Sequence, residues 1–145
     1  MVSTDPGRNK VRTRPRIALV LSLLLVVGCR AAADTPRGTA ERFLDAHYVR
    51  IDLPAALEFT ADLARHKVED ELRLVQGQAI DEGTRKPSVH YRLLEEHPDG
   101  RAAVRYLYRG SITVEDADRL ERRWLVTVRF AEGSWHVTNY EEFEG

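Results

Sequence analysis

The hydrophobic pattern of the chain changes twice, and these changes divide it into three parts. A continuous apolar run covers residues 17–27, with Ser22 as its only polar side chain. Between residues 40 and 76, apolar side chains recur every three or four positions, which is the period of an amphipathic helix. From residue 89 onward they alternate with polar ones, which is the period of a β-strand. The pattern predicts an N-terminal segment, then helices, then strands.

The first predicted helix begins near Thr35, which can act as an N-cap, with Pro36 at the first helical position. Gly38 weakens the first turn, so a start nearer Thr39 stays open. The side chains at helical spacing on one face are Ala40, Phe43, Leu44, His47, Tyr48 and Ile51. This face is expected to pack against the rest of the domain.

Two further helices are predicted before the pattern changes. Asp52 and Asp62 are residues of a type that favours helix starts. A short helix over residues 54–59 and a longer one over residues 62–76 follow them. Gly77, directly after the longer helix, is the residue type that commonly ends a helix.

Four runs of alternating residues predict antiparallel strands joined by short turns, at residues 89–93, 101–114, 120–130 and 135–140. Helices followed by a run of strands are typical of the α+β class. One face of such a sheet is apolar, and the amphipathic helices can cover it. We therefore predict a single α+β domain over residues 39–145.

Two details of the strands carry specific predictions. Gly110 interrupts the longest run, and a bend or bulge is expected there. In the last run, strict alternation places Val137 on one face and Tyr140 on the opposite face.

The N-terminal segment has the layout of a secretory signal. Five basic residues lie between Arg8 and Arg16, ahead of the apolar run. The stretch from Ile17 to Gly28 has 12 residues, whereas a helix that spans a membrane needs roughly 20. An exported chain is therefore predicted rather than one with a membrane-spanning helix.

The sequence Val26-Val27-Gly28-Cys29 resembles the lipobox of bacterial lipoproteins, with Val26 where Leu is more common. The resemblance implies a signal peptide over residues 1–28 and a lipid on Cys29, followed by a tether over residues 29–38. It also implies a cell-envelope location, on the outer face of the cytoplasmic membrane or in the outer membrane facing the periplasm. Cleavage after Ala33, at an Ala-x-Ala site, is the open alternative. Cys29 is the only cysteine, so no intramolecular disulfide is expected.

Loss of the signal changes the charge of the chain. Residues 1–28 contain five basic side chains and one acidic side chain, which leaves 17 basic and 22 acidic of the original 22 and 23. The mature net charge is about −5 with neutral histidines. A nucleic-acid partner is not expected, since phosphate binding requires a basic surface.

Three segments together resemble the nuclear transport factor 2-like superfamily, namely residues 40–48, 53–57 and 132–140. The resemblance implies three N-terminal helices packed into the concave face of a bent, cone-like, four-stranded antiparallel sheet. The superfamily hosts enzymes, binding domains and assembly modules, so the fold alone fixes no function.

Some relatives in that superfamily hold an Asp base and a Tyr in an apolar pocket. The residues that could line such a pocket here are His47, Tyr48, Tyr91, Tyr106 and Tyr108. The alternative is that they fill the core, because their alternation already explains their positions. No Asp lies at a convincing inward strand position, and the five histidines show no tight metal-ligand spacing. We predict no catalytic residue, metal or cofactor, and expect that the protein is not an enzyme.

Arginines are concentrated on the predicted strands, at positions 101, 105, 109, 122, 123 and 129. They form either a solvated sheet face or a face that contacts protein. The expectation is a lipid-anchored, non-catalytic envelope protein that contacts an envelope partner or a second copy of itself. A pocket protein that carries a small ligand or acts as an isomerase is the alternative.

Overall fold

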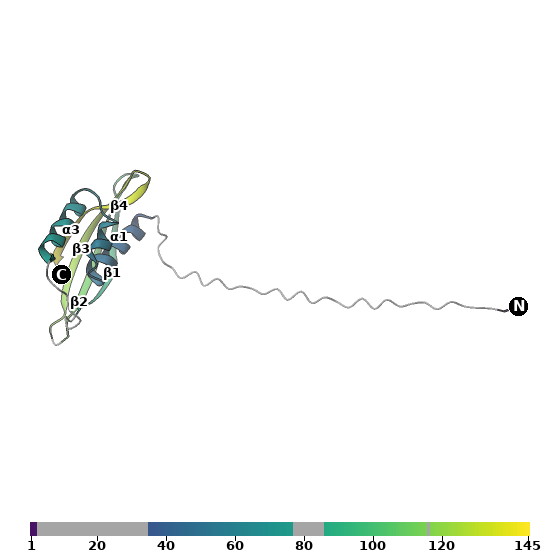
Figure 1. Cartoon of the computed structure of the whole chain (residues 1–145), viewed down its shortest axis with the longest axis horizontal. Coiled ribbons are helices and arrows are strands. Elements are labelled where there is room, and N and C mark those ends of the chain that lie inside the picture. Colours follow the sequence, from purple (N-terminus) through teal and green to yellow (C-terminus); the bar gives the residue numbers. More distant parts are fainter. Residues whose placement is uncertain (3–34, 77–85, 116) are drawn as a thin grey trace.

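The computed structural model describes residues 1–2, 35–76, 86–115 and 117–145 (Figure 1). The helical elements in chain order are α1 (Pro36–Leu44), the π-helix η1 (Asp45–Val49), α2 (Leu53–Leu57) and α3 (Asp62–Val75). The strands are β1 (Ser88–Pro98), β2 (Ala103–Thr113), β3 (Leu120–Ala131) and β4 (Ser134–Glu144). The predicted lipobox with Cys29, the tether up to residue 34 and Gly77 lie outside the described residues.

The helix starts follow the predicted chemistry. Thr35 caps α1, because its Oγ1 accepts a 3.0 Å hydrogen bond from the amide of Gly38. Asp52 caps α2 by accepting a 3.1 Å hydrogen bond from the amide of Ala55. Asp62 is the first residue of α3 rather than its cap, because the N-cap position is Ala61 and no side chain caps this helix. The prediction of helices in this part of the chain is confirmed.

The first helix changes character after Leu44. The sequence predicts one regular helix as far as Ile51, but η1 is a π-helix in which Arg50 donates to the carbonyl of Asp45. A π-helix contains an extra residue per turn and is often found at functional sites. The π-helix ends at Val49, and Ile51, whose φ is 55°, then reverses the chain toward α2.

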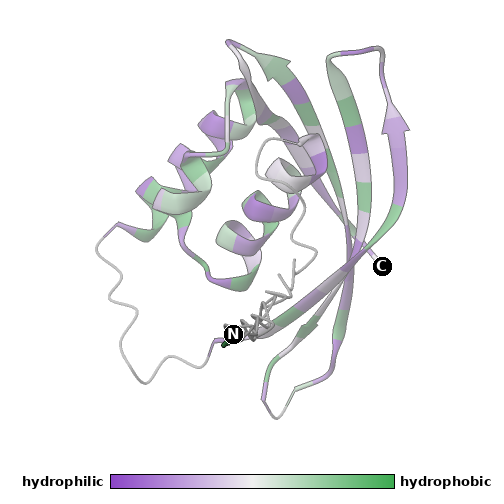
Figure 2. Ribbon diagram, turned by 90° about the vertical axis from the view of Figure 1, so that its right-hand side faces the viewer, coloured by the Kyte–Doolittle hydropathy of each residue, from purple (hydrophilic) through white to green (hydrophobic). Residues whose placement is uncertain are grey.

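The four strands form one antiparallel sheet in the order β1-β2-β3-β4. The sheet is curved, and Figure 2 shows the helices against one of its faces. The helix-covered face holds the core, which includes the completely buried Phe43, Leu44, Val68 and Trp124. The prediction of helices on a bent, four-stranded antiparallel sheet is therefore confirmed. We call the other face of the sheet the outer face.

A β-bulge in β4 corrects the predicted faces of the last strand. Thr127 pairs with Asn139 and Val128 pairs with Val137, so Thr138 is an extra residue. The bulge resets the alternation, and Val137 and Tyr140 are both buried, with exposed fractions of 0% and 7%. The prediction that they lie on opposite faces was wrong, because simple alternation cannot anticipate an extra residue.

The bulge predicted at Gly110 is also absent. Gly110 pairs in continuous register with Tyr91 and with Arg122, and the register shift occurs in β1, where Leu94 is the extra residue. Gly110 instead makes room for an aromatic ring. A Cβ at this position would lie 2.2 Å from the ring of Trp124. The glycine therefore reflects a close packing contact.

Candidate functional site

A polar network joins the helices to β4 inside the domain. His47 of η1 lies 2.7 Å from Glu71 of α3, through Nε2 and Oε2. The hydroxyl of Tyr140 in β4 donates a 2.6 Å hydrogen bond to Oε1 of the same carboxylate. Both oxygens of Glu71 are therefore held, and three elements that are distant in sequence meet at one side chain.

Lys67, one turn before Glu71 on α3, also binds β4. Its Nζ donates to the carbonyl of Tyr140 at 2.7 Å and to Oδ1 of Asn139 at 2.9 Å. Partial burial raises the pKa of Glu71, but the hydrogen bonds from His47 and Tyr140 and the nearby charge of Lys67 outweigh burial, so the net pKa is lowered. The carboxylate of Glu71 is accordingly kept ionised.

His47 is embedded among aromatic rings. Its ring stacks on Phe43 at 5.2 Å and meets Tyr48 edge-on at 4.4 Å between centroids. The side chain is only 9% exposed. Nδ1 is buried without a hydrogen-bond partner among the described residues. A buried, unpaired nitrogen is unfavourable, and it is the strongest local indication of an unusual role.

A second aromatic contact lies beside this network. Tyr48 stacks on Trp124, with centroids 4.3 Å apart and planes at 20°. The indole Nε1 of Trp124 donates a 3.0 Å hydrogen bond to Glu142. Burial, followed by the negative charges of Glu142 and Glu71, raises the pKa of Tyr48. Its hydroxyl therefore stays protonated at neutral pH.

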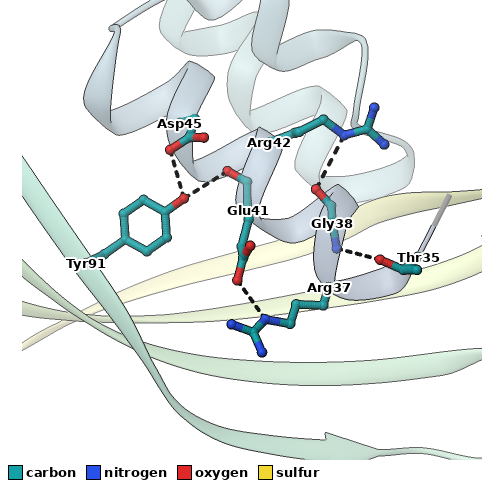
Figure 3. Close-up of polar contacts among 7 residues, drawn as sticks. All are labelled: Thr35, Arg37, Gly38, Glu41, Arg42, Asp45 and Tyr91. Carbon is teal, nitrogen blue, oxygen red and sulfur yellow. Dashed lines mark hydrogen bonds and ion pairs between the residues drawn. The ribbon is translucent and has the colours of Figure 1, made fainter. Parts of the chain in front are cut away.

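Tyr91 belongs to a separate polar group at the β1 side of the sheet. Its hydroxyl donates to the Asp45 carboxylate at 2.8 Å and lies 3.2 Å from the carbonyl oxygen of Glu41 (Figure 3). Glu41 in turn pairs with Arg37 at 2.7 Å (Figure 3). Burial and the contact with Asp45 raise the pKa of Tyr91. These contacts fix β1 to the end of α1.

The remaining predicted pocket residues fill the interior. Tyr106 and Tyr108 are 1% and 0% exposed. Tyr108 packs edge-on against Tyr91, with ring centroids 5.7 Å apart. Burial raises the pKa of Tyr106 to about 12. The hydroxyl of Tyr108 is buried without a hydrogen-bond partner among the described residues.

The five predicted residues thus lie in one interior but in two groups. His47 and Tyr48 are at the α3 and β4 side, and Tyr91, Tyr106 and Tyr108 are at the β1 and β2 side. The ring of Trp124 separates the groups, 4.3 Å from Tyr48 and 6.5 Å from Tyr91.

Sequence reasoning missed Glu71, Tyr140 and Trp124 as members of this site. Tyr140 is predicted on the face opposite to Val137, whereas the bulge at Thr138 places both side chains in the core. Glu71 lies one helical turn after Lys67 and one turn before Val75 on the same predicted helix. The sequence alone does not show which strand packs against this helix, so it does not identify the partners of Glu71. The described residues hold no group of three or more His, Cys, Asp or Glu side chains suited to a metal ion.

Open space lies at the surface rather than among these rings. A groove of about 830 Å³ separates the beginning of α3 from the two hairpin turns, and Asp62, Arg65, Arg129 and His136 are among its lining residues. A shallower hollow of about 710 Å³ lies beside Tyr91, between α1 and β1. Both carry charges of both signs, as expected for solvated clefts.

No family model and no curated protein matches the sequence. Several solved structures share its fold. A protein from Thiobacillus denitrificans, assigned as a calcium/calmodulin-dependent protein kinase type II association domain, is similar with a TM-score of 0.61 and 16% identity over 77% of this chain and 96% of its own. A ketosteroid isomerase-like protein from Erwinia carotovora atroseptica is similar with a TM-score of 0.56 and 16% identity over 74% and 92%.

A nuclear transport factor 2-like protein of unknown function from Shewanella oneidensis is similar with a TM-score of 0.54 and 10% identity, over 74% of this chain and 98% of its own. At these identities the likeness establishes the fold and nothing about activity. The described part of the chain has the nuclear transport factor 2-like fold predicted from its sequence.

Proposed function

We propose that this chain is a lipid-anchored protein of the cell envelope that performs no catalysis and contacts a protein partner or a second copy of itself. The observation that carries the proposal is the filled interior. Trp124, Tyr106, Tyr108 and Phe43 are each at most 1% exposed and occupy the space between helices and sheet. A small-molecule site needs a concave cavity with a few polar groups that converge on it.

The outer face of the sheet supports a contact role. Leu107 and Leu125 are paired across β2 and β3 and are both partly exposed. Phe143 is 47% exposed on β4. Helices cover the opposite face (Figure 2), so this apolar area is available to another molecule. The likeness to a protein assigned as an association domain is consistent with such a role.

The anchor rests on the sequence. Cys29 completes the lipobox-like segment, seven positions before α1 begins at Pro36. No helix among the described residues has the length and apolar character needed to cross a bilayer. A lipid on Cys29 would supply membrane attachment, aided by the Arg-rich start of the signal during export.

Site-specific photo-crosslinking of the full chain in cells tests the contact role. A photoreactive residue at Leu125, on the outer face, should form a defined adduct with one partner or with a second copy. The same residue at Leu63, which is 51% exposed on α3, is the matched control. The absence of any defined adduct from Leu125, with normal accumulation of the protein, would contradict the proposal.

A pocket protein of the same fold is the second candidate, and the unpaired Nδ1 of buried His47 favours it. The likeness to a ketosteroid isomerase-like protein is consistent with this candidate. A hydrophobic fluorescent dye, anilinonaphthalene sulfonate, tests it. Saturable binding that is abolished by His47→Phe, while cooperative unfolding is kept, would favour the pocket over the contact role.

A further inference from the structure

Three arginines lie directly opposite one another on the outer face. Arg92 of β1 pairs with Arg109 of β2, and Arg109 pairs with Arg123 of β3. All three side chains are exposed. Directly paired residues in antiparallel strands lie about 5 Å apart. The three residues therefore form one line across three strands, which we call the arginine row.

Such a row is unfavourable for the isolated domain, because like charges directly opposite one another repel. Four other arginines of the described chain, Arg37, Arg73, Arg119 and Arg122, have carboxylate partners. Arg37 pairs with Glu41 at 2.7 Å, and Arg122 pairs with Glu142 at 3.2 Å. No ion pair connects a member of the arginine row to a carboxylate within the described residues. The charges of the row are therefore available to an outside group.

One end of the row borders a small hollow in the sheet surface. The hollow has a volume of about 150 Å³ and is lined by Arg92 and Arg109 together with His90, Ser111, Arg119 and Glu121. Arg119 is already paired with Glu121 at 2.9 Å, so Arg92 and Arg109 supply its free positive charge. This space suits a single carboxylate side chain, which can accept two parallel hydrogen bonds from a guanidinium group.

The other side of the row leads to the apolar pair of the outer face. Leu107 lies two residues before Arg109 on β2, and its partner Leu125 lies two residues after Arg123 on β3, on the same face as the row. Charged groups beside a partly exposed apolar centre are the usual composition of a protein-contact surface. The charges of the row can therefore orient a bound protein, and the leucine pair provides apolar area for it to bury.

We propose that the arginine row binds an acidic segment of a protein partner, with one carboxylate in the hollow beside Arg92 and Arg109. The mature chain has a net charge of about −5, so it repels negative molecules overall. The row is a local positive area, and a negatively charged partner would bind there. This inference rests on the contact role proposed above and specifies its surface and the chemistry of the partner.

A membrane of anionic lipid could satisfy the same guanidinium groups, but the arrangement favours protein. α1, which follows the proposed anchor, packs on the opposite face of the sheet (Figures 1 and 2). An anchor at Cys29 would hold the domain from its helix-covered side. The arginine row would then point away from the bilayer, toward other proteins of the envelope.

Binding of fluorescent poly-L-glutamate to the purified full chain in uncharged detergent micelles tests this proposal. The triple variant with Arg92→Gln, Arg109→Gln and Arg123→Gln should bind at least about tenfold more weakly, since each charge-assisted contact is lost. A control variant with Arg50→Gln, Arg73→Gln and Arg101→Gln removes the same charge from other exposed positions and should bind within about twofold of the wild type. Circular dichroism should show cooperative melting for all three proteins.

Three results would overturn the proposal: no binding of poly-L-glutamate by the wild type, equal loss of affinity in both triple variants, or binding by the wild type to phosphatidylglycerol vesicles alone. The crosslinking experiment separates this proposal from the one on which it rests. If Leu125 forms adducts but the row variant binds poly-L-glutamate as well as the wild type, the proposal for the arginine row is wrong and the contact role still stands. If poly-L-glutamate binding depends on the row but Leu125 forms no adduct in cells, the proposed contact role in the cell is wrong.

Discussion

Tyr140 donates a 2.6 Å hydrogen bond to Glu71 and thereby fastens the last strand to the third helix. The bond exists only because an extra residue, Thr138, turns Tyr140 toward the helices. Tyr140 is 7% exposed, so its hydroxyl has little access to water. Removal of this hydroxyl group should therefore cause a measurable change in the free energy of unfolding.

Tyr140→Phe should lower the free energy of unfolding by about 1 kcal/mol at neutral pH, the usual net value of one hydrogen bond. Tyr108→Phe is the matched control, because the Tyr108 hydroxyl is buried without a partner among the described residues. Its removal should be neutral or stabilising. Urea denaturation measures both changes, and equal destabilisation by the two substitutions would contradict the proposed network.

Acid should weaken the same network. The pKa of Glu71 is lowered from its ordinary value of 4.5 in the folded protein. Its contribution is therefore present above about pH 4.5 and is lost as the pH falls through the folded pKa. Because Glu71 is 38% exposed, this contribution is discounted to about 1 kcal/mol.

Denaturation of the wild type and of Glu71→Gln at several values between about pH 7 and pH 3 tests this pH dependence. The stability difference between the two proteins should shrink toward the acidic end. A Glu69→Gln control, also on α3, should leave the wild-type pH dependence unchanged. A constant difference between wild type and Glu71→Gln would show that the Glu71 carboxylate is not held as described.

The alkaline behaviour should be unusual, because burial raises the pKa of all five tyrosines. A tyrosine whose pKa is raised in the folded protein contributes stability that is fully present below its unfolded pKa of about 10. This contribution is lost as the pH rises toward the folded pKa, which is about 12 for Tyr106. Tyrosinate absorbance near 295 nm should therefore appear together with unfolding by circular dichroism. A smooth titration centred near pH 10 in the folded protein would contradict this expectation.

Gly110→Ala should destabilise the domain by about 2–3 kcal/mol, because overpacking displaces a core ring. The new Cβ would lie 2.2 Å from the completely buried ring of Trp124. Trp124→Leu, combined with Gly110→Ala, should cost less than the sum of the two single substitutions. Strict additivity in thermal or urea denaturation would show that the two residues do not touch.

Arg109→Thr should increase the stability of the domain by about 0.5 kcal/mol, since the substitution removes two like-charge pairs from the centre of the arginine row and introduces a good strand former. Arg105→Thr on the same strand is the control, because Arg105 faces His97 and Thr127 rather than arginines. A lower stability for Arg109→Thr would indicate that the row has an internal partner.

Most of the fold follows from local patterns in the sequence. Thr35 and Asp52 cap helices as their residue types predict, and alternation placed Tyr106, Tyr108 and Trp124 correctly in the core. The errors arise where backbone geometry depends on distant contacts. Neither the bulge at Thr138 nor the fit of Gly110 under Trp124 leaves a local periodic signal.

The candidate site was predictable only in part for the same reason. His47 was identified because it interrupts an apolar helical face. Its partner Glu71 lies 24 positions away on another helix. Their meeting depends on the π-helix and on the packing of α3 against β4, and both are tertiary effects. The arginine row likewise required the register of three strands.

The two β-bulges also affect whether a neighbouring copy of the domain can pair with the edge strands of the sheet. The free side of β4 is partly occupied, since Val137 exchanges hydrogen bonds with the backbone of Phe59 and Ala61. On the opposite edge, Leu94 breaks the regular spacing of β1, and the strand then carries Glu95 and Glu96 before it ends at Pro98. Irregular spacing, charge and proline all discourage a neighbouring chain from adding another strand. Copies of this domain at high concentration would therefore resist edge-to-edge polymerisation through their sheets.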